Sequence, residues 1–492
     1  MRDAELRAID SGCVSGEGLM ERAGAGVADA IHGLWPGLAG GCAHVLAGPG
    51  NNGGDGYVIA RLLAVRGWGV QVFAIGDPAR LPPDARANAA RWQAMGGVVR
   101  PLGDAPAAPA PDLVVDALFG TGLSRPPEGA ALAALEAAAR GAARAVAVDI
   151  PRGVCGESGR ALAAPLAADL TVTFHRAKPG HYLADGPARC GRVVVADIGL
   201  PDDGRAHPRL AQPMRGFVQA RAGHKYDHGH ALVLSGGAGR SGAARLAARG
   251  ALRVGAGLVT LGAPGAALHE IACQITALML TRVDDGDALR GVLVDPRLNA
   301  LCLGPGLGTG ARAAALVAAA LAAQRATVLD ADALSVLAGD ESLRAALHPG
   351  CVLTPHMGEF ARLCPDLSER LTAPATRGPA FGRLDAVQEA AARFGCTVLL
   401  KGPDTVIAAP EAAPVISAAA YDRAAPWLAT AGAGDVLAGL ISGLLAQGLE
   451  PLRAAETAAW LHVEAARRFG PGLIAEDLPE ALPQVLRGLL SD

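Results

Sequence analysis

Short apolar runs alternate with helical stretches along most of the chain, and this alternation constrains the fold more than any other feature. Six runs in the first half predict buried strands, at residues 43–48, 70–75, 112–120, 145–151, 170–175 and 192–199. Helical segments separate most of these runs. Continuous apolar strands joined by helices are typical of a parallel sheet that is covered on both faces. The first half therefore predicts a doubly wound α/β domain.

A second α/β series follows. Its strands are predicted at residues 230–237, 257–264, 300–306, 326–334, 351–356, 397–402 and 405–410. A helix with one apolar face is predicted over 436–445 near the end of the chain. Between the two series, residues 200–222 lose the alternation and gather Pro, Arg and Asp, which predicts a domain boundary. The length of 492 residues suits two such domains.

Composition excludes several classes of function. The net charge is −3 with both signs mixed along the chain, so the basic stripe of a nucleic-acid binder is missing. The longest apolar run, residues 313–323, is too short to span a bilayer. The charged N-terminus predicts no signal peptide. Nine scattered cysteines without CxxC spacing favour reduced thiols and a cytoplasmic protein.

The segment NNGGDG at residues 51–56 joins a predicted strand to a predicted helix. Free backbone N–H groups gather at a helix N-terminus and favour anions there, and glycines allow a phosphate-bearing ligand to approach. The oxygens of Asn51, Asn52 and Asp55 add hard ligands that suit a hydrated cation or sugar hydroxyls. A tight turn that uses Asn and Gly for positive φ is the structural alternative. The position at a strand end favours a functional loop.

Two further aspartates end predicted strands of the same sheet. Asp116 precedes a glycine turn, and Asp149 precedes a proline turn. Ligands of open parallel sheets bind outside the carboxyl ends of the strands. One such Asp is often only a helix cap. Three strand ends that carry Asp predict a single crevice with a ligand site.

These segments also carry a family resemblance. The motifs LMERAG, NNGGDGYV, VDALFGTGL, VDIPRG and FHRAKPGHY, in this order over about residues 1–212, resemble the NAD(P)H-hydrate epimerase domain. The resemblance implies a Rossmann-like domain that interconverts the R and S forms of hydrated NADH or NADPH (NADHX and NADPHX). It implies that the hydrate contacts Asn51, Asn52, Gly53, Gly54, Asp55, Gly120, Thr121, Gly122, Leu123, Ser124, Arg125, Pro126 and Asp149.

The same resemblance implies a potassium ion held by Asn52 and Asp116. Asp149 is the candidate catalytic residue, because epimerisation at a hemiaminal-like carbon needs a proton to be given to and taken from the leaving hydroxyl. Lys178 is a candidate to steady ligand charge, or else a solvated lysine. Arg152 stands where the family usually has a Ser that binds potassium. If the backbone carbonyl is that ligand, the change is harmless. If the hydroxyl is, a guanidinium about 4 Å from the cation costs on the order of several kcal/mol.

A second glycine-rich loop, TAGAGDVLAG, lies before the predicted C-terminal helix. Gly432 and Gly434 leave room for phosphates, and Asp435 opens the helix. An anion site at a helix N-terminus together with a carboxylate that can deprotonate a hydroxyl suits phosphoryl transfer. The alternative for GAGD alone is a capped helix after a glycine turn. The histidines 224, 228 and 230 have a spacing that suggests a metal, but their place before and at a strand favours ordinary polar contacts.

The second half also resembles a family. GPGLG, TPHMGE, KGPDT and GAGD, with HKYDHGHALVLSGG in front, resemble the ADP-dependent NAD(P)H-hydrate dehydratases, a ribokinase-like branch, over about residues 215–492. The nucleotide-binding residues that this implies are Lys401, Gly402, Pro403, Asp404, Thr405 and Gly434. The residues implied to contact the hydrate are Ala256, Gly306 or Gly308, His356 and Asp435. Met357, Ala431 and Ala433 depart from the family's commoner Pro, Gly and Met, and we expect these changes to be tolerated.

The implied chemistry is consistent. Asp435 would take the hydroxyl proton of the S hydrate during phosphoryl transfer from ADP, which leaves AMP. Ring-nitrogen electrons would then expel phosphate and restore the reduced ring. Mg²⁺ would shield the phosphates, with Glu359 as a water-mediated ligand. The sequence thus predicts a bifunctional nicotinamide-hydrate repair enzyme, expected as a homo-oligomer. The alternatives are a sugar or vitamin kinase in the second half and a non-catalytic binding module in the first.

Overall fold

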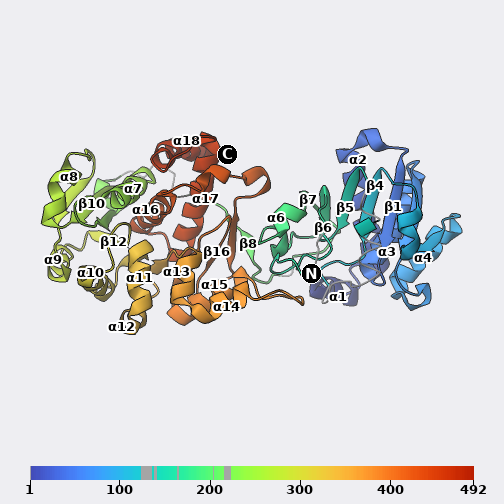
Figure 1. The fold of residues 1–492 in the computed structure, drawn as a ribbon, viewed down its shortest axis with the longest axis horizontal. Coiled ribbons are helices and arrows are strands. Elements are labelled where there is room, and N and C mark those ends of the chain that lie inside the picture. The colour runs from blue at the N-terminus through green and yellow to red at the C-terminus, as the bar shows by residue number, and fades with distance from the viewer. Residues whose placement is uncertain are drawn as a thin grey trace. The chain divides into compact units, whose positions relative to one another are not determined.

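The computed structural model describes residues 2–122, 136–137, 141–162, 166–202, 204–214, 216 and 223–491. The chain forms two compact units (Figure 1). Unit 1 comprises Met1–Arg205 and Pro374–Gly382, and unit 2 comprises Ala206–Ala373 and Arg383–Asp492. Each unit is described by itself below.

Unit 1 is built on a parallel seven-stranded sheet with the order β3-β2-β1-β4-β5-β6-β7. Its strands are β1 (Cys42–Ala47), β2 (Gly69–Ala74), β3 (Val99–Pro101), β4 (Leu113–Ala117), β5 (Arg144–Val148), β6 (Leu170–Phe174) and β7 (Arg192–Ala196). Its helices are α1 (Arg2–Asp10), α2 (Gly16–Leu34), α3 (Asn51–Val65), α4 (Pro83–Ala94) and α6 (Gly186–Arg189). The strand order reverses between β1 and β4, which is where ligands of such sheets bind.

Both faces of this sheet are buried, because alternate side chains of a strand point to opposite faces. Val45 of β1 and Val115 of β4 belong to the core that includes α2, α3 and α4. Leu46 and Val114, their neighbours in sequence, pack on the other face with Leu102 of the 3₁₀ segment η3 (Leu102–Ala107). This two-sided burial explains why the strands are continuous apolar runs in the sequence.

Unit 2 contains a ten-stranded sheet with the order β11-β10-β9-β12-β13-β14-β15-β16-β17-β8. Its strands are β8 (Arg209–Leu210), β9 (His230–Leu234), β10 (Leu258–Ala263), β11 (Met279–Arg282), β12 (Leu298–Leu303), β13 (Ala326–Leu329), β14 (Cys351–Leu353), β15 (Thr397–Leu400), β16 (Asp404–Ala408) and β17 (Val415–Ala418). The strands from β11 to β15 pair in parallel, whereas β16 is antiparallel to both of its neighbours.

The helices of unit 2 cover both faces of this sheet. They are α7 (Gly242–Arg253), α8 (Leu268–Ala272), α9 (Gly286–Val292), α10 (Ala311–Ala322), α11 (Ala331–Gly339), α12 (Glu341–Ala345), α13 (Met357–Leu363), α14 (Pro365–Thr372), α15 (Arg383–Phe394), α16 (Ala433–Ala446), α17 (Pro451–Phe469) and α18 (Asp477–Ser491). The α7, α16, α17 and α18 helices share one core with the strands. Strand residues on the opposite face, such as Leu232 and Leu301, are buried as well.

The predicted fold class of two α/β domains is confirmed. All six strands predicted in the first half and all seven in the second are present. The strands β3, β8, β11 and β17 were not expected. β8 lies in the predicted boundary segment and pairs with β17 in the second sheet. The predicted domain limits, 1–212 and 215–492, stay predictions. None of the helices in the described ranges is long and apolar enough to cross a membrane.

Candidate active sites

A cavity of about 590 Å³ opens at the carboxyl ends of β1, β4 and β5 in unit 1. Residues of the predicted epimerase site line it together with neighbours from α1 and β6. The lining residues are Glu5, Pro49, Gly50, Asn51, Asn52, Asp55, Pro82, Leu118, Phe119, Gly120, Thr121, Gly122, Asp149 and Phe174. The cavity therefore lies at the point where the strand order reverses, as expected for this type of sheet.

Close backbone packing explains part of the glycine content of the first loop. A Cβ atom on Gly48 would lie 1.8 Å from the carbonyl oxygen of Leu118, and one on Gly53 would lie 1.9 Å from that of Gly48. A Cβ atom on Gly54 would meet the side chain of Met20. Gly53 and Gly54 are buried and do not line the cavity. Their predicted contact with the hydrate stays a prediction, while their packing role is clear from the geometry.

Gly120 lies where the side chains of Asn52 and Asp149 approach each other. A Cβ atom on Gly120 would lie 2.9 Å from Oδ2 of Asp149 and 3.1 Å from Oδ1 of Asn52. Asn52 belongs to the first turn of α3, whereas Asp149 directly follows β5. The structure thus brings together residues almost one hundred positions apart, as the strand-end rule predicts.

Asp149 lies in a dense network of hydrogen bonds. Its Oδ1 pairs with Nζ of Lys178 at 2.7 Å and accepts a hydrogen bond from the Thr173 hydroxyl at 3.0 Å. Its Oδ2 accepts from the Thr121 N–H, and its carbonyl oxygen bonds Nε2 of His181. Its φ of 70° lies in the left-handed region, which is strained for a residue other than glycine. A strained residue that is held from four sides is typical of a functional position.

The two aspartates of the cavity, Asp149 and Asp55, have different electrostatic environments. Burial raises the pKa of Asp149, but the adjacent Lys178 ammonium outweighs it and holds that pKa below its usual range. Burial raises the pKa of Asp55 well above its usual range, and the Asp149 and Glu5 carboxylates raise it further. Lys178 is itself buried, so the solvated-lysine alternative is wrong. The cavity therefore holds two carboxyl groups whose pKa values are shifted in opposite directions.

Asp116 is buried at the end of β4 beside an arginine. Its Oδ1 accepts a hydrogen bond from the Leu118 N–H at 3.2 Å, whereas its Oδ2 has no hydrogen-bond partner among the described residues. Nη1 of Arg152 lies 3.8 Å from that Oδ2, and both side chains are 3% exposed. Burial raises the pKa of Asp116, and the Arg152 charge opposes this rise. Nδ2 of Asn52 is likewise buried without a partner in the part of the chain that the structure describes.

Four predicted epimerase residues cannot be placed. Leu123, Ser124, Arg125 and Pro126 lie outside the described residues. Gly120, Thr121 and Gly122, the predicted residues that directly precede them in the sequence, line the cavity.

The second candidate site lies at the N-terminus of α16 in unit 2. Gly432 precedes the helix with a left-handed φ of 85°, and Asp435 lies in the first turn. His462 of α17 bonds the Ala433 carbonyl oxygen through Nε2 at 2.8 Å. A Cβ atom on Gly434 would lie 3.4 Å from Nζ of Lys401. The helix N-terminus therefore faces the lysine of the KGPDT segment, as the predicted site requires.

Two carboxylates lie close to the ammonium group of Lys401. Its Nζ lies 2.6 Å from Oδ1 of Asp330, which precedes α11, and 3.8 Å from Oε2 of Glu359 in α13. Its backbone N–H donates to the Pro355 carbonyl oxygen after β14. Burial lowers the pKa of Lys401, but Asp330 and Glu359 outweigh it and raise that pKa. Lys401 is thus charged and held in place beneath the opening of α16.

Asp435 has the electrostatic environment of a general base. Burial and the neighbouring Asp330 carboxylate raise its pKa to about 6, against the opposing Lys401 charge. A base works best when its pKa lies near the operating pH. Asp435 is therefore ionised at neutral pH and still basic enough to accept a proton from a hydroxyl.

The predicted nucleotide turn is tight. The Thr405 hydroxyl donates to the Gly402 carbonyl oxygen and accepts from the Gly402 N–H, so residues 402–405 form a closed loop. Asp404 lies 3.4 Å from Nε of Arg383, which also donates to the Lys401 carbonyl oxygen. Gly402 and Pro403 are exposed.

The remaining predicted residues differ in accessibility. His356 is exposed and caps α13 through Nδ1. Its backbone N–H donates to Oε2 of Glu359 at 2.8 Å. Gly308 donates to Oδ2 of Asp332 at 2.8 Å in the first turn of α11, so the GPGLG loop meets this site. Ala256 is buried in the core. Gly306 has a left-handed φ of 65° and is partly buried.

Sequence analysis missed Asp330. It directly follows β13, as Asp149 follows β5, so the rule that selected Asp149 would also have selected it. The histidines 224 and 230 make ordinary contacts, since His224 stacks on Tyr226 and His230 bonds the Thr260 hydroxyl.

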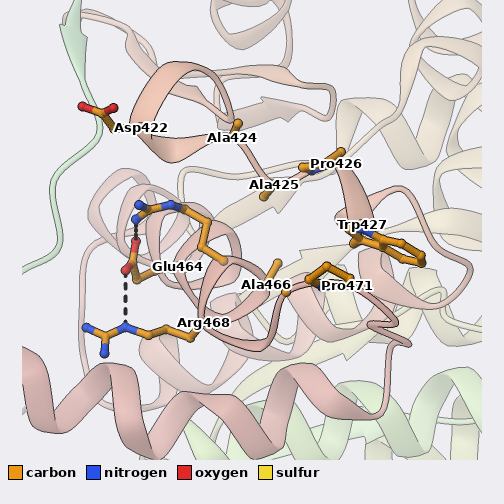
Figure 2. A pocket seen from close by; sticks show the side chains of 11 residues that line it. Asp422, Ala424, Ala425, Pro426, Trp427, Glu464, Ala466, Arg468 and Pro471 are labelled. Carbon is orange, nitrogen blue, oxygen red and sulfur yellow. Dashed lines mark hydrogen bonds and ion pairs between the residues drawn. The ribbon is translucent and has the colours of Figure 1, made fainter.

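A separate hollow of about 430 Å³ lies beside α17 (Figure 2). Trp427 and Pro426 line one part of it, and Glu464 lies in another, paired with Arg467 and Arg468. None of the predicted dehydratase residues lines this hollow. Glu464 is paired with arginines there, and Asp422, the other acidic residue that lines the hollow, is exposed to solvent.

Fold and sites together define a two-unit α/β enzyme with a carboxylate centre at the sheet end of each unit. The model of the NAD(P)H-hydrate dehydratase family matches residues 231–484, and that of the YjeF-related protein N-terminus matches residues 16–180. The bifunctional NAD(P)H-hydrate repair enzyme Nnr of Moorella thermoacetica is 36% identical and covers 96% of this chain and 92% of its own. That of Coxiella burnetii is 34% identical and covers 97% and 96%.

The chain belongs to the family of bifunctional NAD(P)H-hydrate repair enzymes, and both predicted resemblances are confirmed. Among solved structures, the ADP/ATP-dependent NAD(P)H-hydrate dehydratase of Bacillus subtilis, co-crystallised with ATP and Mg²⁺, is similar. It is 27% identical with a TM-score of 0.46 and covers 57% of this chain and 95% of its own.

Proposed function

We propose that unit 1 epimerises the R and S hydrates of NADH and NADPH and that unit 2 dehydrates the S hydrate at the expense of ADP, giving AMP and phosphate. Family membership supports the pair of activities. The observation that carries the assignment to units is that each has its own carboxylate centre, at Asp149 in one and Asp435 in the other. One substrate would pass from the first centre to the second.

In unit 1 the two carboxyl groups of the cavity divide the proton transfers. Asp149, ionised beside Lys178, accepts a proton from the water that returns to the ring as the hydroxyl. Asp55, whose pKa is raised by burial and by the nearby Asp149 and Glu5 carboxylates, donates the proton that lets the hydroxyl leave as water. Loss and return of the hydroxyl on opposite faces of the ring invert the carbon. Asn51, Asn52 and residues 120–126 hold the dinucleotide.

In unit 2 Asp435 removes the hydroxyl proton while the N-terminus of α16 and Lys401 stabilise the phosphate charge. Residues 401–405 and Gly434 hold the adenine nucleotide, and Gly306, Gly308, His356 and Ala256 surround the hydrate. Mg²⁺ would neutralise phosphate oxygens when bound. Glu359 would hold it through water, because its Oε2 already accepts a hydrogen bond from the His356 N–H in the capping box of α13.

The potassium ion that the resemblance implies does not fit the residues around Asp116. The carbonyl oxygens of Pro151, Arg152 and Gly153 all accept backbone hydrogen bonds, and the Arg152 guanidinium lies at the Asp116 carboxylate. A cation about 4 Å from this guanidinium would be repelled by about 4 kcal/mol at an effective dielectric near 20. We therefore derive no step through potassium.

Recovery of reduced nicotinamide tests both activities at once. A purified mixture of hydrate epimers is mixed with the protein and ADP, and the absorbance of reduced nicotinamide is followed. Full recovery supports both activities, half recovery supports the dehydratase only, and no recovery with ADP or ATP contradicts the proposal. Release of free phosphate, rather than a stable phosphorylated product, separates repair from a sugar or vitamin kinase.

The cellular setting is proposed from the thiols. The nine cysteines form no disulfide in the part of the chain that the structure describes, which supports a reducing compartment such as the cytoplasm. The predicted homo-oligomer stays a prediction that light scattering of the purified protein measures.

A further inference from the structure

We propose that the guanidinium of Arg152 takes the place of a bound monovalent cation beside Asp116, so that this chain's epimerase site works without potassium. Arg152 acts as a positioning residue, because it contacts Asp116 and not the cavity. The proposal concerns the same site as the proposed function, but its binding tests do not depend on that function.

The charge of Asp116 needs a partner at this place. The carboxylate is 4% exposed, and its Oδ2 has no hydrogen-bond partner among the described residues. A buried carboxylate is costly unless a positive group lies nearby. Nη1 of Arg152 lies 3.8 Å from that oxygen and is its one ion-pair partner in the described ranges. The arginine thus supplies the charge that a bound cation would supply.

Arg152 is suited to this role by its chemistry. A guanidinium stays charged in a protein interior and is more weakly hydrated than an ammonium, so it tolerates burial. Its Nε and Nη1 are buried without hydrogen-bond partners in the part of the chain that the structure describes. The group therefore contributes its charge to Asp116 and is not tied to a competing acceptor through these two atoms.

The backbone of the turn after β5 fixes where this side chain begins. Val154 N–H donates to the Pro151 carbonyl oxygen, Leu166 N–H to that of Arg152, and Leu162 N–H to that of Gly153. Gly153 has a left-handed φ of 82° that closes the turn. These bonds anchor the turn, and the Arg152 side chain that it carries supplies the positive charge beside Asp116.

Cation dependence provides the test. The wild-type protein and the variant Arg152→Ser are melted in KCl, NaCl and tetramethylammonium chloride at equal ionic strength. We expect the wild-type melting temperature to be the same in KCl and NaCl. We expect Arg152→Ser to melt lower and to regain about 2–4 °C specifically in KCl, because the vacated space admits potassium. Arg91→Ser, which removes a half-exposed arginine paired with Glu17, is the matched control and should show no such selectivity.

Thallium(I), a heavy substitute for potassium, gives a direct readout. Its anomalous scattering in crystals should show no ion beside Asp116 in the wild type and one ion there in Arg152→Ser. Thallium at Asp116 in the wild type overturns the proposal, and so does a folded Arg152→Ser that binds none. If Arg152→Ser does not fold, the wild-type crystal and the charge-retaining Arg152→Lys decide, since neither should bind thallium.

Kinetics complete the test. We expect wild-type epimerisation to differ by less than about twofold between potassium and tetramethylammonium, and Arg152→Ser to lose about tenfold in tetramethylammonium and recover in potassium. A wild-type rate that requires potassium overturns the proposal. If the protein epimerises in no condition, the proposed function of unit 1 fails, while the thallium result still decides the role of Arg152.

Discussion

Asp149 and Asp435 are the candidate catalytic carboxylates of their units, yet their surroundings are opposite. Asp149 pairs with the Lys178 ammonium at 2.7 Å, which holds its pKa low. Asp435 shares its surroundings with the Asp330 carboxylate, and its pKa rises to about 6. A lysine is near both, but in unit 2 Lys401 is bound to Asp330 at 2.6 Å and its charge is largely taken up there. Burial raises the pKa of both aspartates, and the balance between the nearby lysine and the nearby carboxylates then makes Asp149 the weaker base and Asp435 the stronger one.

Replacing the strong base should have the largest effect. Asp435→Asn should lower the dehydratase kcat by about 10³-fold, because loss of a positioned general base typically costs 10²–10⁴-fold. Recovery of reduced nicotinamide from purified S hydrate with ADP measures it. Asp422→Asn, an exposed aspartate that lines the hollow of Figure 2, should leave the rate unchanged. Equal rates for Asp435→Asn and the wild type would contradict the role of Asp435.

The weaker base should matter less. Asp149→Asn should slow R-to-S interconversion by about 10²-fold, measured by chromatographic separation of the epimers, while the dehydratase rate from S hydrate stays unchanged. Removing the carboxylate also leaves Lys178 buried without its partner, at a cost of about 3 kcal/mol in unfolding free energy. The double variant Asp149→Asn with Lys178→Met should regain part of that stability and none of the activity. Unchanged interconversion would instead favour the non-catalytic module.

Asp330 allows the comparison to be sharpened within one site. Its charge raises the pKa of Asp435, so Asp330→Asn should lower that pKa. The acidic limb of the dehydratase kcat/KM profile should then move to lower pH by about one unit. The plateau should fall by about tenfold, since Lys401 loses its closest partner. A limb that stays in place would contradict the role of Asp330 in raising the pKa of Asp435.

The strands that carry both sites, and the polar residues at the ends of those strands, could be predicted because each is marked by a short local pattern in the sequence. Apolar runs marked the strands, and polar residues at the ends of those strands marked Asp116, Asp149 and the Asn pair. β3, β8 and β11 were missed because they are short, edge-proximal and partly exposed, so no continuous apolar run marks them. β17 is buried but only four residues long. Such a run is too short to be distinguished from a loop.

The electrostatic partners could not be predicted in the same way. Lys178 pairs with Asp149 across 29 positions, and Lys401 pairs with Asp330 across 71. No local sequence pattern indicates pairs that are so far apart in the chain. The departure at Arg152 was visible in the sequence, but its side chain's approach to Asp116 depends on how the turn after β5 is anchored. Which group holds which charge is a property of the packed sheet.

Stability gives the smallest and most specific test of the comparison. The folded-state pKa of Asp435, about 6, lies above the unfolded value of 3.8. The folded protein therefore binds the proton more tightly, so this group's contribution is fully present below about pH 4 and is lost as pH rises through 6. Asn cannot ionise, so Asp435→Asn should be more stable than the wild type by about 1 kcal/mol above pH 7, after allowance for the partial exposure of Asp435. The gain should vanish near pH 4.

Asp149→Asn should show the opposite sign at neutral pH, because the pKa of Asp149 is lowered in the folded state and its ionised form stabilises the fold. Urea unfolding of both variants at pH 4.5 and 7.5 measures this difference, and equal signs for the two variants would contradict the contrast between the two sites.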